Sequence, residues 1–151
     1  MGITTSNKQI DRDRIDCDGM LKVTLALSAS PDIASNPTDI VLVLERSGSM
    51  EGAPLANMKA GAKTFIDIID EATDNSKDGN IGSGSRIGIV SFADTATADT
   101  LLITSVATLK SAVDSLTAGG FSNQADAFAK AKQLVDPLST NGKVIVMVSD
   151  G

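Results

Sequence analysis

The chain has 151 residues, of which 42% are hydrophobic and 21% are charged, which is the balance of one ordinary globular domain. Its formal net charge of −6 argues against a phosphate-binding surface, and therefore against nucleic acid as a partner, whereas cations are natural ligands. Because the sequence contains no histidine, we expect neither a histidine general base nor a Ser–His–Asp or Cys–His arrangement.

Targeting signals are not recognisable in the chain. The N-terminal residues lack the basic patch and apolar core of a signal peptide, and no run approaches the ~20 apolar residues of a membrane span. The compartment is therefore unknown from the sequence, since an export signal could lie outside it. The single cysteine, Cys17, cannot form an internal disulfide, and we expect it to be an ordinary thiol.

The N-terminal part, residues 1–38, is predicted to be a tail followed by one strand. Residues 1 to about 19 are polar and charged, which is typical of a tail or linker. From Leu21, apolar and polar residues alternate, which predicts a half-buried strand over about 21–28. Pro31 and Pro37 then interrupt the chain, and we expect a separate domain over residues 39–151.

Strands and helices are expected to alternate through residues 39–151. The run from Ile40 to Leu44 is apolar without polar alternation, which predicts a strand buried on both faces of a parallel sheet. The remaining periodicities predict helices over about 54–72, 106–116 and 127–135, a second central strand over 85–93, a short edge strand over 101–104 and a last buried strand over 144–149. This alternation predicts an α/β fold with a mostly parallel central sheet flanked by helices.

Oxygen ligands follow the first buried strand at every second residue: Glu45, Ser47 and Ser49. Gly48 allows the backbone to turn between the two hydroxyls, and Pro54 suits the first turn of the helix that follows. In open parallel sheets, ligand sites form beyond the carboxyl ends of the strands. Hard oxygen ligands without histidine or cysteine favour Mg²⁺, Mn²⁺ or Ca²⁺.

Two later segments extend this pattern. Gly119-Gly120-Phe121-Ser122-Asn123 is a glycine turn with a hydroxyl before a helix, and Lys143-Val-Ile-Val-Met-Val-Ser149-Asp150-Gly151 is a buried strand that ends in an acid. Together, the three motifs resemble those of the von Willebrand factor type A domain. The metal-ion-dependent adhesion site (MIDAS) of that family has the pattern Asp-x-Ser-x-Ser, a Thr after a Gly-rich turn, and an Asp at the end of a later strand. The resemblance runs from about Asp39 to the last residue.

The resemblance implies a Rossmann-like fold and a binding module, not an enzyme. It implies that Ser47, Ser49 and Ser122 offer hydroxyls to a divalent cation, that Glu45 and Asp150 supply negative charge, and that a carboxylate of a protein partner completes the coordination. The family makes an extracellular or cell-surface location conceivable. It also places the strand at 144–149 beside the strand at 40–44, with two more strands beyond it. We therefore expect a domain that is incomplete at its C-terminus, with a missing segment or self-association covering the edge of Val144 to Val148.

The sequence departs from the family pattern at several positions. Glu45 stands where the family has Asp, Ser122 where it has Thr, and Phe121 where a third Gly is usual. Ser for Thr keeps the hydroxyl. Glu for Asp adds about 1.5 Å of reach, and Mg²⁺, which needs a near-ideal octahedron, should respond to this change more than Ca²⁺.

Two other functions remain as alternatives. A structural or decayed fragment without metal binding would agree with Glu45, and Ser47-Gly48-Ser49 taken alone could simply cap a helix. A nucleotide-binding α/β enzyme is suggested by Ser47-Gly48-x-x-x-Gly52 after a strand. However, Pro54 stands where a further glycine is needed, and no lysine occupies the P-loop position.

Other polar segments are expected to be structural. Residues 74–81 copy the opening of an EF-hand loop, but Ser85 stands where a bidentate Glu is needed and a strand follows, so we expect a solvated loop. We expect Asp94 to cap a loop, Asn123 and Asp126 to cap the third helix, and Asp39 to lie at the end of its strand away from the site.

Overall fold

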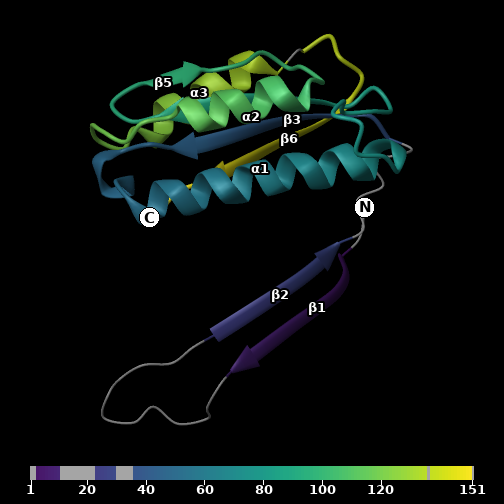
Figure 1. Cartoon of the computed structure of the whole chain (residues 1–151), viewed down its shortest axis with the longest axis horizontal. Coiled ribbons are helices and arrows are strands. Elements are labelled where there is room, and N and C mark those ends of the chain that lie inside the picture. The colour runs from purple at the N-terminus through teal and green to yellow at the C-terminus, as the bar shows by residue number, and fades with distance from the viewer. Residues whose placement is uncertain (1–2, 11–22, 30–35, 136, 151) are drawn as a thin grey trace. The chain divides into compact units, whose positions relative to one another are not determined.

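The computed structural model describes residues 3–10, 23–29, 36–135 and 137–150 (Figure 1). The chain divides into two compact units, Met1–Asp32 and Ile33–Gly151. This boundary lies a few residues before Asp39, where the sequence suggested that the main domain begins. Cys17 and Pro31 lie outside the described residues.

The first unit contains an antiparallel hairpin. Strand β1 (Ile3–Ile10) pairs with β2 (Val23–Ala29), with Ile10 opposite Val23. The prediction of a tail over residues 1–19 is therefore wrong for Ile3–Ile10, whereas the strand predicted at 21–28 is present as β2. A lone strand leaves its backbone donors and acceptors unpaired, so β2 requires a partner strand. The sequence of this partner strand carries no strand signal, because it is polar and lacks apolar alternation.

The second unit is built on a mixed sheet with the strand order β5-β4-β3-β6. Its strands are β3 (Thr38–Glu45), β4 (Arg86–Phe92), β5 (Ala96–Ala98) and β6 (Gly142–Val148). β3 runs parallel to both β4 and β6, and β5 is antiparallel to β4. The predicted α/β class, the mostly parallel sheet and the position of the last strand beside the first are confirmed.

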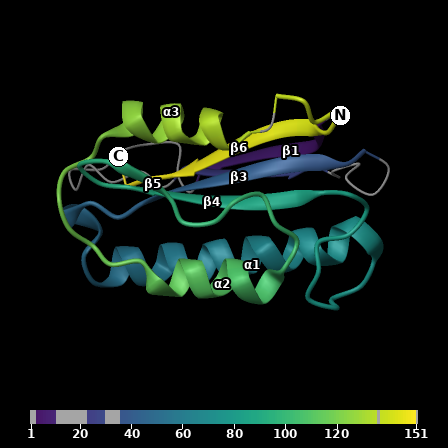
Figure 2. The ribbon, with the colours of Figure 1, turned by 90° about the horizontal axis from the view of Figure 1, so that it is seen from above.

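Helices cover both faces of this sheet. α1 (Ala53–Asp74) and α2 (Val106–Ser115) lie on one face and α3 (Gln124–Leu134) lies on the other, as Figure 2 shows. A short 3₁₀ helix, η1 (Gly48–Met50), precedes α1, and Pro54 stands in the first turn of α1 as predicted. Asn123 caps α3, because its side chain accepts a hydrogen bond from the backbone N–H of Asp126 at 3.1 Å.

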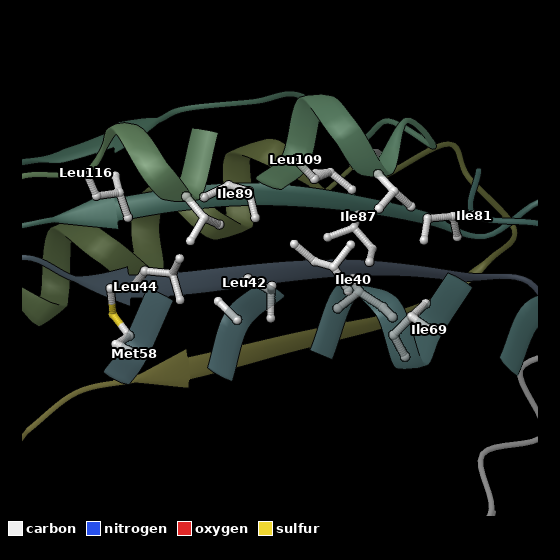
Figure 3. Close-up of a cluster of buried hydrophobic side chains, with 14 of the residues drawn as sticks. Ile40, Leu42, Leu44, Met58, Ile69, Ile81, Ile87, Ile89, Leu109 and Leu116 are labelled. Carbon is white, nitrogen blue, oxygen red and sulfur yellow. The ribbon is translucent and has the colours of Figure 1, made fainter. Parts of the chain in front are cut away.

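β3 is buried on both faces, and its side chains divide between two cores. Ile40, Leu42 and Leu44 pack in a cluster with residues of α1 and α2 (Figure 3). Val41 and Val43 pack on the opposite face against Ala127 and Ala131 of α3. The continuous apolar run is therefore explained by burial on both sides of a central strand, as in other parallel sheets.

The edge strand differs from the prediction. β5 is formed by Ala96–Ala98, not by residues 101–104, where only Ile103 makes an isolated bridge to Ile87. Between these two points, the backbone N–H of Ile89 donates to the side-chain hydroxyl of Thr100 at 2.9 Å. This side-chain contact replaces a backbone ladder bond, so the segment after β5 does not continue as a strand.

β6 is the last strand on its side of the described sheet, and Val144, Ile145 and Val148 are exposed. Among the described residues, no helix combines the length and apolar character that crossing a membrane requires.

Candidate metal site

The candidate site begins at the last residue of β3. Glu45 is fully buried although it is charged, and it lies at the carboxyl end of the central strand. The hydroxyl of Ser47 donates to Glu45 Oε1 at 2.7 Å and lies 2.9 Å from the hydroxyl of Ser49. The alternating spacing seen in the sequence therefore brings one carboxylate and two hydroxyls together.

The glycine turn before α3 closes over these residues. The backbone N–H of Gly48 donates to the carbonyl of Gly120 at 2.9 Å, and that of Gly119 donates to the carbonyl of Arg46 at 2.8 Å. These bonds place Ser122 so that its hydroxyl also donates to Glu45 Oε1. The second predicted motif therefore reaches the same carboxylate as the first.

Asp94 holds this turn through two hydrogen bonds. Its Oδ1 accepts a hydrogen bond from the backbone N–H of Phe121 at 3.0 Å, and its carbonyl accepts one from the side chain of Asn123 at 3.1 Å. Gly120 has a φ of +82°, and a Cβ there would lie only 2.3 Å from Asp94 Oδ2. Only glycine fits this position without rearrangement. The predicted loop-capping role of Asp94 is confirmed.

The third motif arrives through the parallel pairing of β3 and β6. Leu44 pairs with Val148, so one residue further the register places Ser149 beside Glu45 and Asp150 beside Arg46. The backbone of Asp150 helps to lower the pKa of the Glu45 carboxyl, and Asp150 is exposed at the same edge. The structure thus brings Glu45, Ser47, Ser49 and Ser122 into contact and places Asp150 next to them.

Ser149 also lies at the candidate site, although the sequence did not mark it as a ligand. Its hydroxyl lies near enough to the Glu45 carboxyl to help lower the pKa of that group. The register of the two parallel strands could have predicted this position. The residue after the last apolar position of β6 lies beside Glu45, the acid that ends β3.

The hydroxyls control the charge of Glu45. Burial by itself raises the pKa of this carboxyl, but the hydroxyls of Ser122, Ser149 and Ser47 and the backbone of Asp150 outweigh burial and hold the pKa below its usual value. Glu45 is therefore a carboxylate at neutral pH, in the ionised form that a cation requires.

One oxygen of this carboxylate has no partner. Glu45 Oε2 is buried and accepts no hydrogen bond from the described part of the chain. An unpartnered anionic oxygen beside hydroxyls is costly in isolation and suits a hard cation. No group of three or more His, Cys, Asp or Glu residues able to hold a metal occurs in residues 3–10, 23–29, 36–135 and 137–150, so any ligand set here depends on hydroxyls.

The other polar motifs serve local structure. In the loop after α1, Asp74 Oδ1 accepts from the backbone N–H and the hydroxyl of Ser76, and Asp78 accepts from the backbone N–H of Asn80. The backbone N–H of Gly48, which a phosphate turn would need, is already bonded to Gly120. Asp39 lies at the opposite end of β3, as predicted, where it pairs with Arg86.

A known protein family has both this fold and this order of motifs. The sequence model of the von Willebrand factor type A domain matches residues 40–151. The chain belongs to this family. Domains of this family generally mediate protein interactions.

Solved von Willebrand factor type A domains have the same fold. The vWF domain of the type V pili tip protein Mfa5 from Porphyromonas gingivalis is 25% identical with a TM-score of 0.69, over 77% of this chain and 38% of that chain. Proximal thread matrix protein 1 from the mussel byssus, solved with a zinc-occupied MIDAS motif, is 27% identical with a TM-score of 0.59, over 77% of this chain and 29% of that chain.

A curated relative is known from Synechocystis sp., where the protein named sll0103 is 30% identical over 71 residues, which are 47% of this chain and 17% of the relative. This von Willebrand factor type A domain therefore spans well under half the length of each of these relatives.

Proposed function

We propose that this von Willebrand factor type A domain binds a divalent cation at the carboxyl end of β3 and, through it, a carboxylate of a protein partner. The observation that carries the proposal is Glu45 Oε2, a buried anionic oxygen without a hydrogen-bond partner beside the hydroxyls of Ser47 and Ser122. A cation provides the interaction that this oxygen lacks.

Each residue has a distinct role in this proposal. Ser47, Ser49 and Ser122 offer neutral oxygen ligands, and Glu45 supplies a buried negative charge whose lowered pKa keeps it ionised. Asp150, exposed at the same edge, supplies the second charge. A bound cation surrounded mainly by hydroxyls would keep enough positive charge to attract an external carboxylate.

The ligand atoms suit Mg²⁺ or Mn²⁺, and the length of Glu45 also suits the more adaptable Ca²⁺. Zn²⁺ belongs in the test because the similar mussel protein is described with a zinc-occupied MIDAS motif. Affinity for zinc does not by itself identify the resident metal, since most divalent sites bind it more tightly than Mg²⁺ or Mn²⁺.

We propose a binding module and not an enzyme for a chemical reason. A general base needs a pKa near the working pH, whereas the pKa of Glu45 is lowered and the sequence has no histidine. The carboxylate is therefore suited to hold a cation and poorly suited to accept a proton at neutral pH.

Titration calorimetry of the 151-residue chain with Mg²⁺, Mn²⁺, Ca²⁺ and Zn²⁺ tests the proposal. The double variant Ser47→Ala/Ser49→Ala should lose measurable binding of Mg²⁺ and Mn²⁺. Ser111→Ala/Ser115→Ala is a matched control, because both serines lie exposed on α2 and the Ser115 hydroxyl donates to the carbonyl of Ala112 within that helix. Circular dichroism should show the same fold in all three proteins.

Unchanged cation affinity in Ser47→Ala/Ser49→Ala would contradict the proposed site. If the wild-type chain bound none of the four ions while remaining folded, the structural alternative without metal binding would be correct. Those two results differ, because the first leaves a cation bound elsewhere and the second shows no bound cation.

A further inference from the structure

Phe121 stands out among the aromatic residues of the chain. The sequence has four phenylalanines and no tryptophan or tyrosine. Phe92 is completely buried, whereas the side chain of Phe121 is 83% exposed. A single exposed apolar residue needs no special explanation. Phe121, however, lies directly before Ser122, whose hydroxyl contacts the buried carboxylate of the candidate site.

The backbone around Phe121 is held in place. The carbonyl of Gly120 accepts from Gly48, the N–H of Phe121 donates to Asp94 Oδ1, and the hydroxyl of Ser122 donates to Glu45. Three successive residues are thus tied to two segments, the end of β3 with the start of η1 and the turn after β4. The phenyl ring therefore projects from a constrained turn. A partner that contacts the ring does not have to order a free loop, and the loss of affinity that such ordering causes is avoided.

The charges around the site limit which acidic partner it can accept. Glu51, Asp94 and Asp150 are exposed on the segments that form the site, and the whole chain has a net charge of −6. A densely acidic segment would be repelled by these groups. A single carboxylate with an uncharged apolar neighbour avoids this repulsion and can bury surface against Phe121.

We propose that Phe121 is the apolar half of the binding surface, and that the partner is a protein segment with one carboxylate and an apolar side chain one or two residues away from it. This inference rests on the proposed function, which supplies the contact for the carboxylate. Successive residues of an extended segment are about 3.3–3.6 Å apart along the chain. This spacing suits one contact at Phe121 and one at a cation held by the adjacent Ser122.

A displayed peptide library with a fixed central Asp and two random residues on either side tests the proposal, in the presence of Mg²⁺. A second library with a fixed central Ala reports binding that does not need the acid. Both are selected on the wild-type chain, on Phe121→Ser and on Leu138→Ser. Leu138 is a matched control because it is 90% exposed and precedes β6, at the end of the sheet opposite to the site.

The wild-type chain and Leu138→Ser should retain the Asp library over the Ala library and enrich apolar residues beside the Asp. Phe121→Ser should still prefer Asp but lose the apolar enrichment. For the best selected peptide and its apolar-to-Ser counterpart, the ratio of dissociation constants should be about fivefold or more with the wild-type chain, as for an interface residue that contributes measurably, and close to one with Phe121→Ser.

Cation affinity measured by calorimetry should be the same in Phe121→Ser and the wild type, which shows that the site is intact. Apolar enrichment that persists in Phe121→Ser, or an Asp preference without any apolar enrichment in the wild type, would overturn the role of Phe121 and leave the proposed function standing. Equal retention of the Asp and Ala libraries by the wild-type chain would overturn both.

Discussion

Ser122 donates a hydrogen bond to Glu45 although 77 residues separate them in the sequence. The bond joins the turn before α3 to the end of β3. It exists because the carboxyl ends of the parallel strands meet at one edge of the sheet, where the connecting loops also gather. The candidate site is therefore a product of strand order, since no local segment contains more than part of it.

The length of Glu45 should influence which cation the site prefers. Replacing Glu45 by Asp shortens the side chain by one methylene, about 1.5 Å of reach. This change should increase the affinity for Mg²⁺ more than that for Ca²⁺, because the smaller ion tolerates less departure from an octahedron. Calorimetric titration of both ions measures the two changes. Equal changes, or a larger gain for Ca²⁺, would show that this side chain does not determine the metal geometry.

The turn before α3 should be sensitive to any side chain at position 120. In Gly120→Ala, the Cβ would meet Asp94 Oδ2 at 2.3 Å, so Asp94 must rotate and release the N–H of Phe121. Together with the positive φ, this should lower the free energy of unfolding by about 2–3 kcal/mol. It should also weaken cation binding, because Ser122 moves with the turn.

Gly79→Ala is the matched control for that substitution. Gly79 also has a positive φ, +88°, but a Cβ there would have no neighbour within 4 Å. It should cost about 1–2 kcal/mol through backbone strain alone and leave cation affinity unchanged. Urea unfolding and calorimetry measure the two effects. Equal loss of cation affinity in both variants would show that the contact with Asp94 is unimportant.

The opposite end of the sheet should depend on the Asp39–Arg86 pair. Arg86 binds both oxygens of the buried Asp39, at 2.9 and 2.8 Å, and Asn141 adds a further hydrogen bond at 2.9 Å. Arg86→Ala should lower the free energy of unfolding by about 3 kcal/mol, the lower end for a buried pair, because the Arg86 side chain is 33% exposed. Lys63→Ala, which breaks an exposed pair with Asp114, should cost less than about 1 kcal/mol.

The contribution of this pair should vanish in acid. Burial by itself raises the pKa of Asp39, but the hydrogen bonds from Arg86, Asn141 and Ser139 and the charge of Arg86 outweigh it and hold the pKa below 3.8. A carboxyl whose pKa is lowered in the folded state stabilises the fold fully at pH values above its usual pKa of 3.8. This stabilisation is lost as the pH falls through the pKa of the folded state. The difference in unfolding free energy between wild type and Arg86→Ala should therefore shrink below about pH 4. A difference independent of pH would contradict the role of the charge.

Local patterns were sufficient for the main elements of the larger unit. Burial on one or two faces imposes a period on the sequence, and this period indicates β3 by its apolar run and α1 by its helical spacing. The residue types around Ser47 indicate the turn. The resemblance to the family then supplied the neighbours of β3. The grouping of Glu45, Ser47, Ser49 and Ser122 is what the order of the family's motifs implies.

The errors of prediction occurred where a segment depends on a distant partner. β1 is polar and becomes a strand by pairing with β2, while the edge strand lies at Ala96–Ala98 because Thr100 interrupts the ladder with its hydroxyl. Neither the pairing of β1 with β2 nor the contact of the Thr100 hydroxyl produces a hydrophobic period in the sequence.

By itself, the sequence determined the fold class and the main ligand candidates of this protein, because hydrophobic period and turn chemistry act within a few residues. Only the tertiary structure decided that Ser149 lies near Glu45, that Asp94 accepts a hydrogen bond from the N–H of Phe121, and that Phe121 is exposed beside the site. Each of these depends on the register of parallel strands and on the packing of loops from different strands. Such contacts join residues that are far apart in the chain, and no local pattern specifies them.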